Sequence, residues 1–92
     1  MTFEWDDHKA ETNLADHKVS FEQAKRVFDD PLAVPFKDEA HSSADEDRYV
    51  LIGMSMVGLL FVSFTYRNNT IRLISARRAS RRMQRIYTDG KK

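Results

Sequence analysis

The side chains best suited to chemistry in this sequence are arginines near its C-terminal end. Four of them have the i, i+3, i+4, i+7 spacing of one helical face: Arg78, Arg81, Arg82 and Arg85. A guanidinium group is planar and can form two parallel hydrogen bonds to a phosphate. A basic helix can also simply face solvent. Because this helix follows a strand-like segment and is interleaved with serine and tyrosine, we expect a surface that binds nucleic acid.

Histidine and tyrosine side chains supply candidates for proton transfer. RNA carries its own nucleophile, the 2′-hydroxyl, so its cleavage needs a base, cations for the developing charge and an acid for the leaving oxygen. His17 lies at an expected corner between two helices, His41 in a polar loop, and Tyr87 in the basic helix. Each has a structural alternative: a helix-end contact, a solvated side chain and a core position, respectively. We keep all three as unranked acid–base candidates, with Arg77 and Arg78 as catalytic cations.

Further cations could hold the RNA backbone: Lys9, Arg48, Arg81, Arg82 and Arg85. Other kinds of site have no support in the sequence. The absence of cysteine excludes a disulfide scaffold, a cysteine-ligated metal and thiol catalysis. No histidine pair has metal-ligand spacing supported by a carboxylate motif, and there is no glycine-rich phosphate loop or Gly-x-Ser-x-Gly motif. We therefore expect no metal and no cofactor, and cleavage that proceeds without a metal.

The net charge of +1 conceals an uneven distribution along the chain. Residues 1–47 carry 13 acids and 5 bases, and residues 48–92 carry 1 acid and 10 bases, which give net charges of −8 and +9. The second half is thus the part suited to an anionic ligand. The N-terminus has no signal-peptide pattern, and the apolar run at 50–64 is shorter than the about 20 residues of a membrane-spanning helix. We expect a cytoplasmic protein with one domain, residues 1–92.

Two helices are expected in the N-terminal third of this α+β chain. Asp6 can cap a helix over about residues 7–17. Ser20 and Gln23 have the capping-box pattern at the start of a second helix, which Pro31 ends. The inner stripe of that helix would be Phe21, Ala24, Val27 and Phe28. The two helices should form a tight hairpin that covers one face of a sheet.

The remaining segments predict a mostly antiparallel sheet. Three strands would form a meander: residues 48–56, 59–66 and 70–77. Asn68 and Asn69 tolerate the positive φ of the turn before the last strand. A short strand at 3–5 and an edge strand within 32–37, where Pro35 forbids a central position, would complete the sheet.

The last strand and the basic helix should follow each other directly. Regular alternation would place Ile71, Leu73 and Ser75 on one face of the strand, and Arg72, Ile74 and Ala76 on the other. The helix would turn Ala79, Met83, Ile86 and Tyr87 toward the sheet. A basic C-terminal helix would then lie behind the sheet with its arginines outside.

Several short motifs form a recognisable set along the chain. They are Phe3-Glu4-Trp5-Asp6 with Lys9, Asn13-Leu14 and His17; Val19-Ser20-Phe21-Glu22 with Ala24; Val27-Phe28-Asp29-Asp30-Pro31; His41-Ser42; Arg48-Tyr49 with Gly53; and Ile74-Ser75-Ala76-Arg77-Arg78-Ala79 with Arg81-Arg82 and Tyr87. Taken together over residues 3–88, these segments resemble the BrnT-type toxins. One position departs from the family pattern, because Lys18 stands where a glycine usually follows the histidine.

The resemblance implies a RelE-like fold and a bacterial ribonuclease toxin of a type II toxin–antitoxin pair, which inhibits translation. It also implies three partners: RNA as the substrate, a BrnA-type antitoxin with a ribbon-helix-helix domain, and operator DNA bound through the complex, which would repress its own operon. The antitoxin could mask residues 75–82 with acidic side chains, or add a strand near Pro35. A non-catalytic nucleic-acid or protein-binding module remains the alternative, and it would retard RNA without shortening it.

Overall fold

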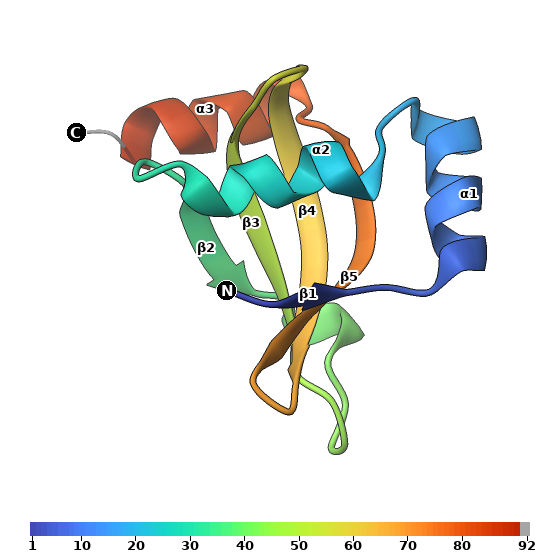
Figure 1. The fold of residues 1–92 in the computed structure, drawn as a ribbon. Coiled ribbons are helices and arrows are strands. Elements are labelled where there is room, and N and C mark those ends of the chain that lie inside the picture. Colours follow the sequence, from blue (N-terminus) through green and yellow to red (C-terminus); the bar gives the residue numbers. More distant parts are fainter. Residues whose placement is uncertain (91–92) are drawn as a thin grey trace.

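A five-stranded mixed sheet organises residues 1–90, the part of the chain that the computed structural model describes (Figure 1). The strands are β1 (Phe3–Glu4), β2 (Val34–Lys37), β3 (Arg48–Ser55), β4 (Gly58–Arg67) and β5 (Thr70–Arg78), in the spatial order β1-β5-β4-β3-β2. The helices are α1 (Asp7–His17), α2 (Phe21–Lys25) and α3 (Arg81–Gly90), with 3-10 turns η1 (Arg26–Asp29) and η2 (Glu39–His41). The expected α+β class, with a short N-terminal strand and a C-terminal helix, is confirmed.

The three central strands form the predicted antiparallel meander. Asn68 and Asn69 have φ values of 53° and 64°, so the turn before β5 uses the left-handed conformations that asparagine tolerates. β1 pairs with β5 in parallel, and β2 pairs with β3 at the opposite edge of the sheet. Pro35 therefore lies in an edge strand, where its missing N–H costs no hydrogen bond of the sheet.

A β-bulge in β5 changes which residues face each side of the sheet. Leu73 and Ser75 pair with consecutive residues of β4, so Ile74 is the extra residue. Leu73 packs in the core under α2, and so does Ala76 beyond the bulge. The regular alternation expected from the sequence is wrong here, because one extra residue reverses the phase of the strand. Ser75 and Arg77 consequently face the side opposite to Leu73.

Helices cover the two faces of the sheet unequally. On one face α2 and η1 bury the predicted stripe, with Phe21, Ala24 and Val27 fully inside and Phe28 half-buried. On the other face α3 covers only part of the sheet, where Tyr87 packs with residues of β3. Figure 1 shows α2 lying across the sheet and α1 standing beside β5, so α2 alone of these two helices covers a face.

Local signals place the starts of α1 and α2 as the sequence predicts. The carboxylate of Asp6 accepts the Lys9 N–H at 2.9 Å, and both hydrogen bonds of the box between Ser20 and Gln23 are present. Lys18 has a φ of 60° in the left-handed region and donates its N–H to a carbonyl of α1. The geometry that favours glycine at that position is therefore kept by a lysine.

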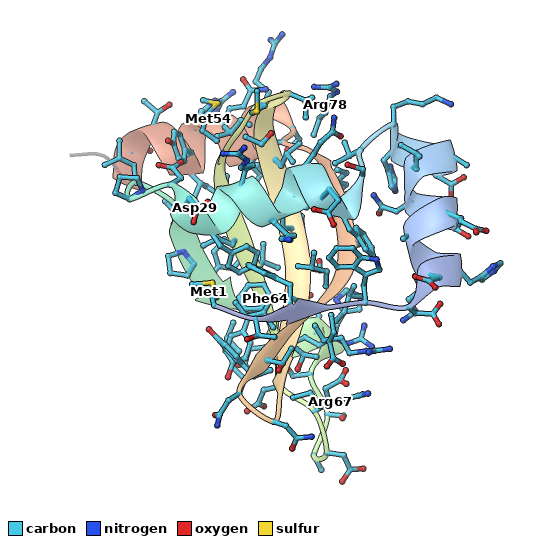
Figure 2. The ribbon with its side chains drawn as sticks, in the orientation of Figure 1. Met1, Asp29, Met54, Phe64, Arg67 and Arg78 are labelled. Atoms are coloured by element: carbon cyan, nitrogen blue, oxygen red, sulfur yellow. The ribbon has the colours of Figure 1, made fainter. Side chains whose placement is uncertain are left out.

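The C-terminal helix begins later than the arginine periodicity suggests. Arg78 is the last residue of β5, so its expected place on the face of the helix is wrong. It lies at one end of the sheet and Arg67 at the other (Figure 2). Ile86 is 36% exposed rather than packed on the sheet. No helix within residues 1–90 is long and apolar enough to cross a membrane.

Candidate active site

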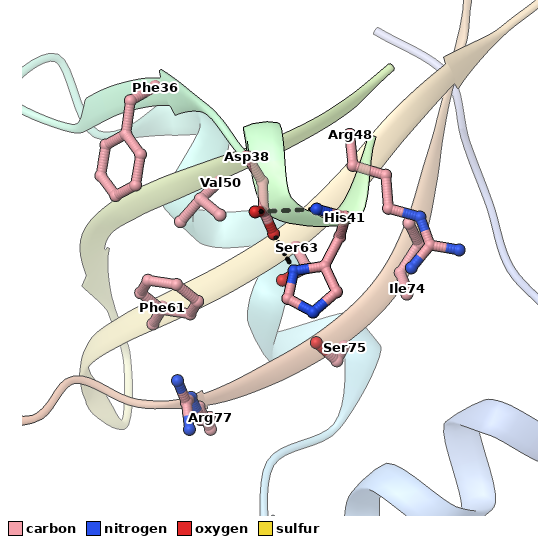
Figure 3. A pocket seen from close by; sticks show the side chains of 10 residues that line it. All are labelled: Phe36, Asp38, His41, Arg48, Val50, Phe61, Ser63, Ile74, Ser75 and Arg77. Atoms are coloured by element: carbon pink, nitrogen blue, oxygen red, sulfur yellow. Dashed lines mark hydrogen bonds and ion pairs between the residues drawn. The ribbon is translucent and has the colours of Figure 1, made fainter. Parts of the chain in front are cut away.

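A pocket of about 410 Å³ opens on the sheet face that α3 leaves partly uncovered. Its polar groups come from the segment between β2 and β3 and from the three meander strands: Asp38, His41, Arg48, Ser63, Ser75 and Arg77. Figure 3 shows these side chains gathered around one opening. The apolar walls are Phe36, Val50, Phe61 and Ile74. The pocket thus combines a histidine, a carboxylate, two arginines and two hydroxyl groups.

Asp38 holds His41 in a defined orientation. Its Oδ2 lies 2.8 Å from Nδ1 of the imidazole, and its Oδ1 accepts the backbone N–H of His41 at 3.3 Å. The same carboxylate therefore caps η2 and orients the ring that η2 carries. The second ring nitrogen, Nε2, is turned away from Asp38 (Figure 3). A carboxylate on one imidazole nitrogen leaves the other free to exchange a proton with a substrate.

Ser42 fixes this short turn to the sheet. Its hydroxyl donates to the Asp38 carbonyl at 2.7 Å and accepts the Arg48 N–H at 2.9 Å. The Asp38 N–H in turn donates to the Arg48 carbonyl at 2.8 Å. Because both ends of the turn are bonded to the start of β3, His41 is held at a constant place although its side chain is exposed.

The two arginines of the pocket differ in how far their charge is compensated. Arg48 donates through Nε to the Glu46 carboxylate at 2.9 Å, and this bond is the main reason why the pKa of Glu46 is lowered. Arg77 forms no ion pair with any residue among 1–90. Its guanidinium lies 4.9 Å from the centre of the Phe61 ring, the residue directly opposite on β4. Arg77 is therefore a positioned cation with an unneutralised charge.

Two serines form a small, polar floor between these groups. Ser63 and Ser75 are directly opposite each other on β4 and β5. Their small side chains leave room above the sheet, and each hydroxyl can donate to an anion. A base, fixed cations and hydroxyl donors around an open floor can bind a phosphodiester and accept the proton of its nucleophile.

The structure gathers some of the sequence candidates and separates others. His41, Arg48 and Arg77 meet in the pocket, as does Asp38, which sequence reasoning missed. Its position three residues before a histidine, at the start of a one-turn helix, is the signal that could have identified it. His17 and Lys9 line a different hollow, on the α1 side of β5.

Tyr87 lies outside the pocket, in the contact between α3 and the sheet. Its ring is 5% exposed, and its hydroxyl donates to Oδ2 of Asp30 at 2.8 Å. The same oxygen accepts the Met54 N–H at 2.8 Å. Burial, and then this hydrogen bond, raise the pKa of the phenol. These contacts connect α3 to Asp30 and, through Asp30, to β3.

The other arginines that the sequence suggested for the site do not line the pocket. Arg78 donates to the Val57 carbonyl at the β3–β4 turn. Arg81, Arg82 and Arg85 are exposed on α3. Among residues 1–90, no three histidine, aspartate or glutamate side chains come together in a group that could hold a metal ion.

Comparison with known proteins gives one family. A family model described as "Ribonuclease toxin, BrnT, of type II toxin-antitoxin system" matches residues 5–82. The match includes every polar residue of the pocket and ends before Arg85 and Tyr87. No curated protein matches the chain.

Proposed function

Because the chain belongs to the BrnT family of ribonuclease toxins of type II toxin–antitoxin systems, we propose that it cleaves RNA in the pocket of His41 and Arg77. The observation that carries this proposal is the Asp38–His41 pair at 2.8 Å, in one pocket with Arg77, which no acid among residues 1–90 neutralises. The pair supplies a base, and the cation supplies the electrostatic stabilisation that phosphate chemistry needs.

The reaction is an internal transesterification of the RNA backbone. His41 takes the proton of the 2′-hydroxyl through Nε2 while the 2′-oxygen forms a bond to phosphorus. The bond between phosphorus and the 5′-oxygen breaks, and that oxygen takes a proton from water. The products are a 2′,3′-cyclic phosphate and a 5′-hydroxyl end. Arg77 and Arg48 stabilise the additional negative charge on the phosphoryl oxygens, and the serine hydroxyls bind those oxygens.

The proposed chemistry uses side chains and a water molecule. The 2′-hydroxyl is the nucleophile, so no metal-bound hydroxide is required. The cations of the pocket perform the charge stabilisation that a divalent ion provides in other nucleases. Cleavage is therefore metal-independent and needs no cofactor.

Exposed basic residues extend the RNA surface beyond the pocket. We assign Arg81, Arg82 and Arg85 of α3, and Lys9 of α1, to contacts with the RNA backbone. Their ammonium and guanidinium groups neutralise phosphates, and binding should weaken steeply with salt because counterions are released. Cleavage of cytoplasmic RNA by this surface and pocket would stop translation.

The toxin family also implies an inhibitor in the same cell. We propose a BrnA-type antitoxin with a ribbon-helix-helix domain, whose complex with this chain binds operator DNA and represses their own operon. Exposed arginines that form no ion pair within residues 1–90 support an acidic partner segment at residues 75–82.

The test is cleavage of a 5′-labelled RNA in excess chelator, with analysis of the product ends. We expect shortened RNA with 2′,3′-cyclic phosphate ends, and a rate that falls at least about 100-fold in His41→Ala. Arg26→Ala, an exposed arginine beside the opposite sheet face, is the charge-matched control for variants of Arg77. Loss of activity in chelator, restored by a divalent ion, would refute the metal-free reaction. Retarded but intact RNA would favour the alternative, a binding module.

A further inference from the structure

A second hollow lies across β5 from the pocket, between the strand and α1. It has a volume of about 410 Å³, and its floor is formed by Ile74 and Ser75. Six residues of α1, spaced so that they share one helical face, form its wall: His8, Lys9, Thr12, Asn13, Asp16 and His17. This volume falls within the roughly 300–1,000 Å³ of small-molecule pockets. The hollow is therefore large enough for a nucleotide.

Asn13 makes the wall of this hollow rigid. Its amide nitrogen donates to the carbonyls of Val19 and Ala76, each at 2.9 Å, and its amide oxygen accepts the Ala76 N–H at 2.9 Å. The side chain is 5% exposed. α1 is thus bonded to the backbone of β5 just beyond the bulge, and Asn13 is engaged by the fold. The groups that remain for a ligand include Lys9, Asp16 and His17.

The two hollows are neighbours. Both are bordered by Ile74 and Ser75, the residues at the bulge of β5. A single RNA strand can therefore cross β5 at Ser75, with one nucleotide in each hollow and cations on both sides of the crossing.

We propose that the hollow between α1 and β5 holds the nucleotide next to the cleaved bond, and that Asp16 selects a base carrying an amino group. This inference rests on the proposed ribonuclease function. Lys9 and Asp16 are seven residues apart on α1, which is about 10 Å along the helix axis. A phosphate belongs at the Lys9 end, since the carboxylate repels it. The base edge then lies at Asp16, against the flat imidazole of His17 and the apolar side chain of Ile74.

The selectivity follows from the hydrogen-bonding groups of the bases. A carboxylate only accepts hydrogen bonds, and cytosine, adenine and guanine each offer an amino donor. Uracil offers a single N–H between two carbonyl oxygens, whose lone pairs repel the carboxylate. The comparison of cytosine with uracil is the cleanest, because both are pyrimidines and differ little in stacking area.

The test measures binding of short RNA that cannot be cleaved. Labelled 2′-O-methyl tetranucleotides of cytidine and of uridine are titrated with the protein and followed by fluorescence anisotropy. We expect the cytidine oligomer to bind about tenfold tighter. Asp16→Asn should bring the ratio near one, because an amide can pair with either base. Glu11→Gln makes the same charge change on α1 outside this hollow, and should keep the preference.

Equal affinity of the wild type for the two oligomers, no binding of either, or an unchanged preference in Asp16→Asn would overturn the inference. Cleavage of unmodified RNA is measured in parallel on the same preparations. A wild type that cleaves RNA but binds both oligomers equally would overturn the subsite alone. A wild type that leaves RNA intact would overturn the proposed function, whichever oligomer it prefers.

Discussion

Replacement of two neighbouring arginines tests whether the bulge in β5 sets the active site. The bulge turns Arg77 into the pocket, and Arg78 donates instead to the Val57 carbonyl at the end of the sheet. Arg77→Ala should therefore lower the rate of RNA cleavage much more than Arg78→Ala does. Regular alternation without a bulge would predict the reverse, since it exchanges the faces of these two residues.

The expected loss of cleavage rate in Arg77→Ala depends on how strongly solvent screens the charge of Arg77. In the transition state the phosphoryl group carries about one more negative charge than in the substrate. At ~4 Å from a cation, that charge is stabilised by about 1 kcal/mol in water and about 4 kcal/mol near a protein surface. Since about 1.4 kcal/mol is a factor of ten, the rate should fall by roughly 5- to 1,000-fold. Arg78→Ala should change it by less than about threefold, because its partner is a backbone carbonyl outside the pocket.

The assay is single-turnover cleavage of a labelled RNA at saturating and subsaturating protein. Stabilisation of the transition state alone predicts a lower maximal single-turnover rate, with little change in the protein concentration that gives half of that rate. Arg77→Lys should recover part of the rate, because it keeps the charge but loses the planar contact with Phe61. Thermal unfolding of each variant controls for the fold. A larger loss in Arg78→Ala than in Arg77→Ala would refute the assignment of faces.

Three further changes test the fold and the partner surface. Asn13→Ala leaves buried backbone groups of β5 without partners, so the free energy of unfolding in urea should fall by at least about 3 kcal/mol, whereas half-exposed Leu14→Ala should cost below about 1 kcal/mol. Folding raises the pKa of the Tyr87 phenol above its ordinary value of 10.0. The protonated phenol therefore stabilises the fold fully below pH 10.0, and this stabilisation is lost as the pH rises through the pKa of the folded protein. Tyr87→Phe should cost about 1 kcal/mol at neutral pH and should lose less stability above pH 10.0; an identical alkaline decline in both proteins would contradict this. Replacement of both Arg81 and Arg82 by alanine should weaken RNA cleavage and antitoxin affinity together if the partner masks this helix, and unchanged affinity would place the partner elsewhere.

Local signals in the sequence were sufficient for most elements of the fold. The Asp6 cap, the Ser20 capping box and the asparagine turn each act within a few residues, so they place helix ends and strand ends without knowledge of distant contacts. Pro35 assigns its strand to an edge by its missing N–H. The charge asymmetry and the motif set likewise indicated an anion-binding surface and a family before any contact was known.

The composition of the pocket depended on the tertiary structure. His41 acquires its orientation from Asp38 on the same turn, but Arg77 reaches the same pocket only through the pairing of β5 with β4 and of β4 with β3. Nothing in the local pattern of the last strand reveals the extra residue at Ile74, because a bulge arises from how one strand matches its neighbour.

In the basic helix, too, the sequence determined some features and the tertiary structure decided others. Its arginine spacing correctly indicated an exposed cationic face, since solvent exposure follows directly from charge. The spacing could not show that the helix starts only at Arg81, or that the hydroxyl of Tyr87 donates a hydrogen bond to Asp30. The periodicity of one segment determines which of its residues share a face. The packing of the whole chain decides which distant groups that face contacts.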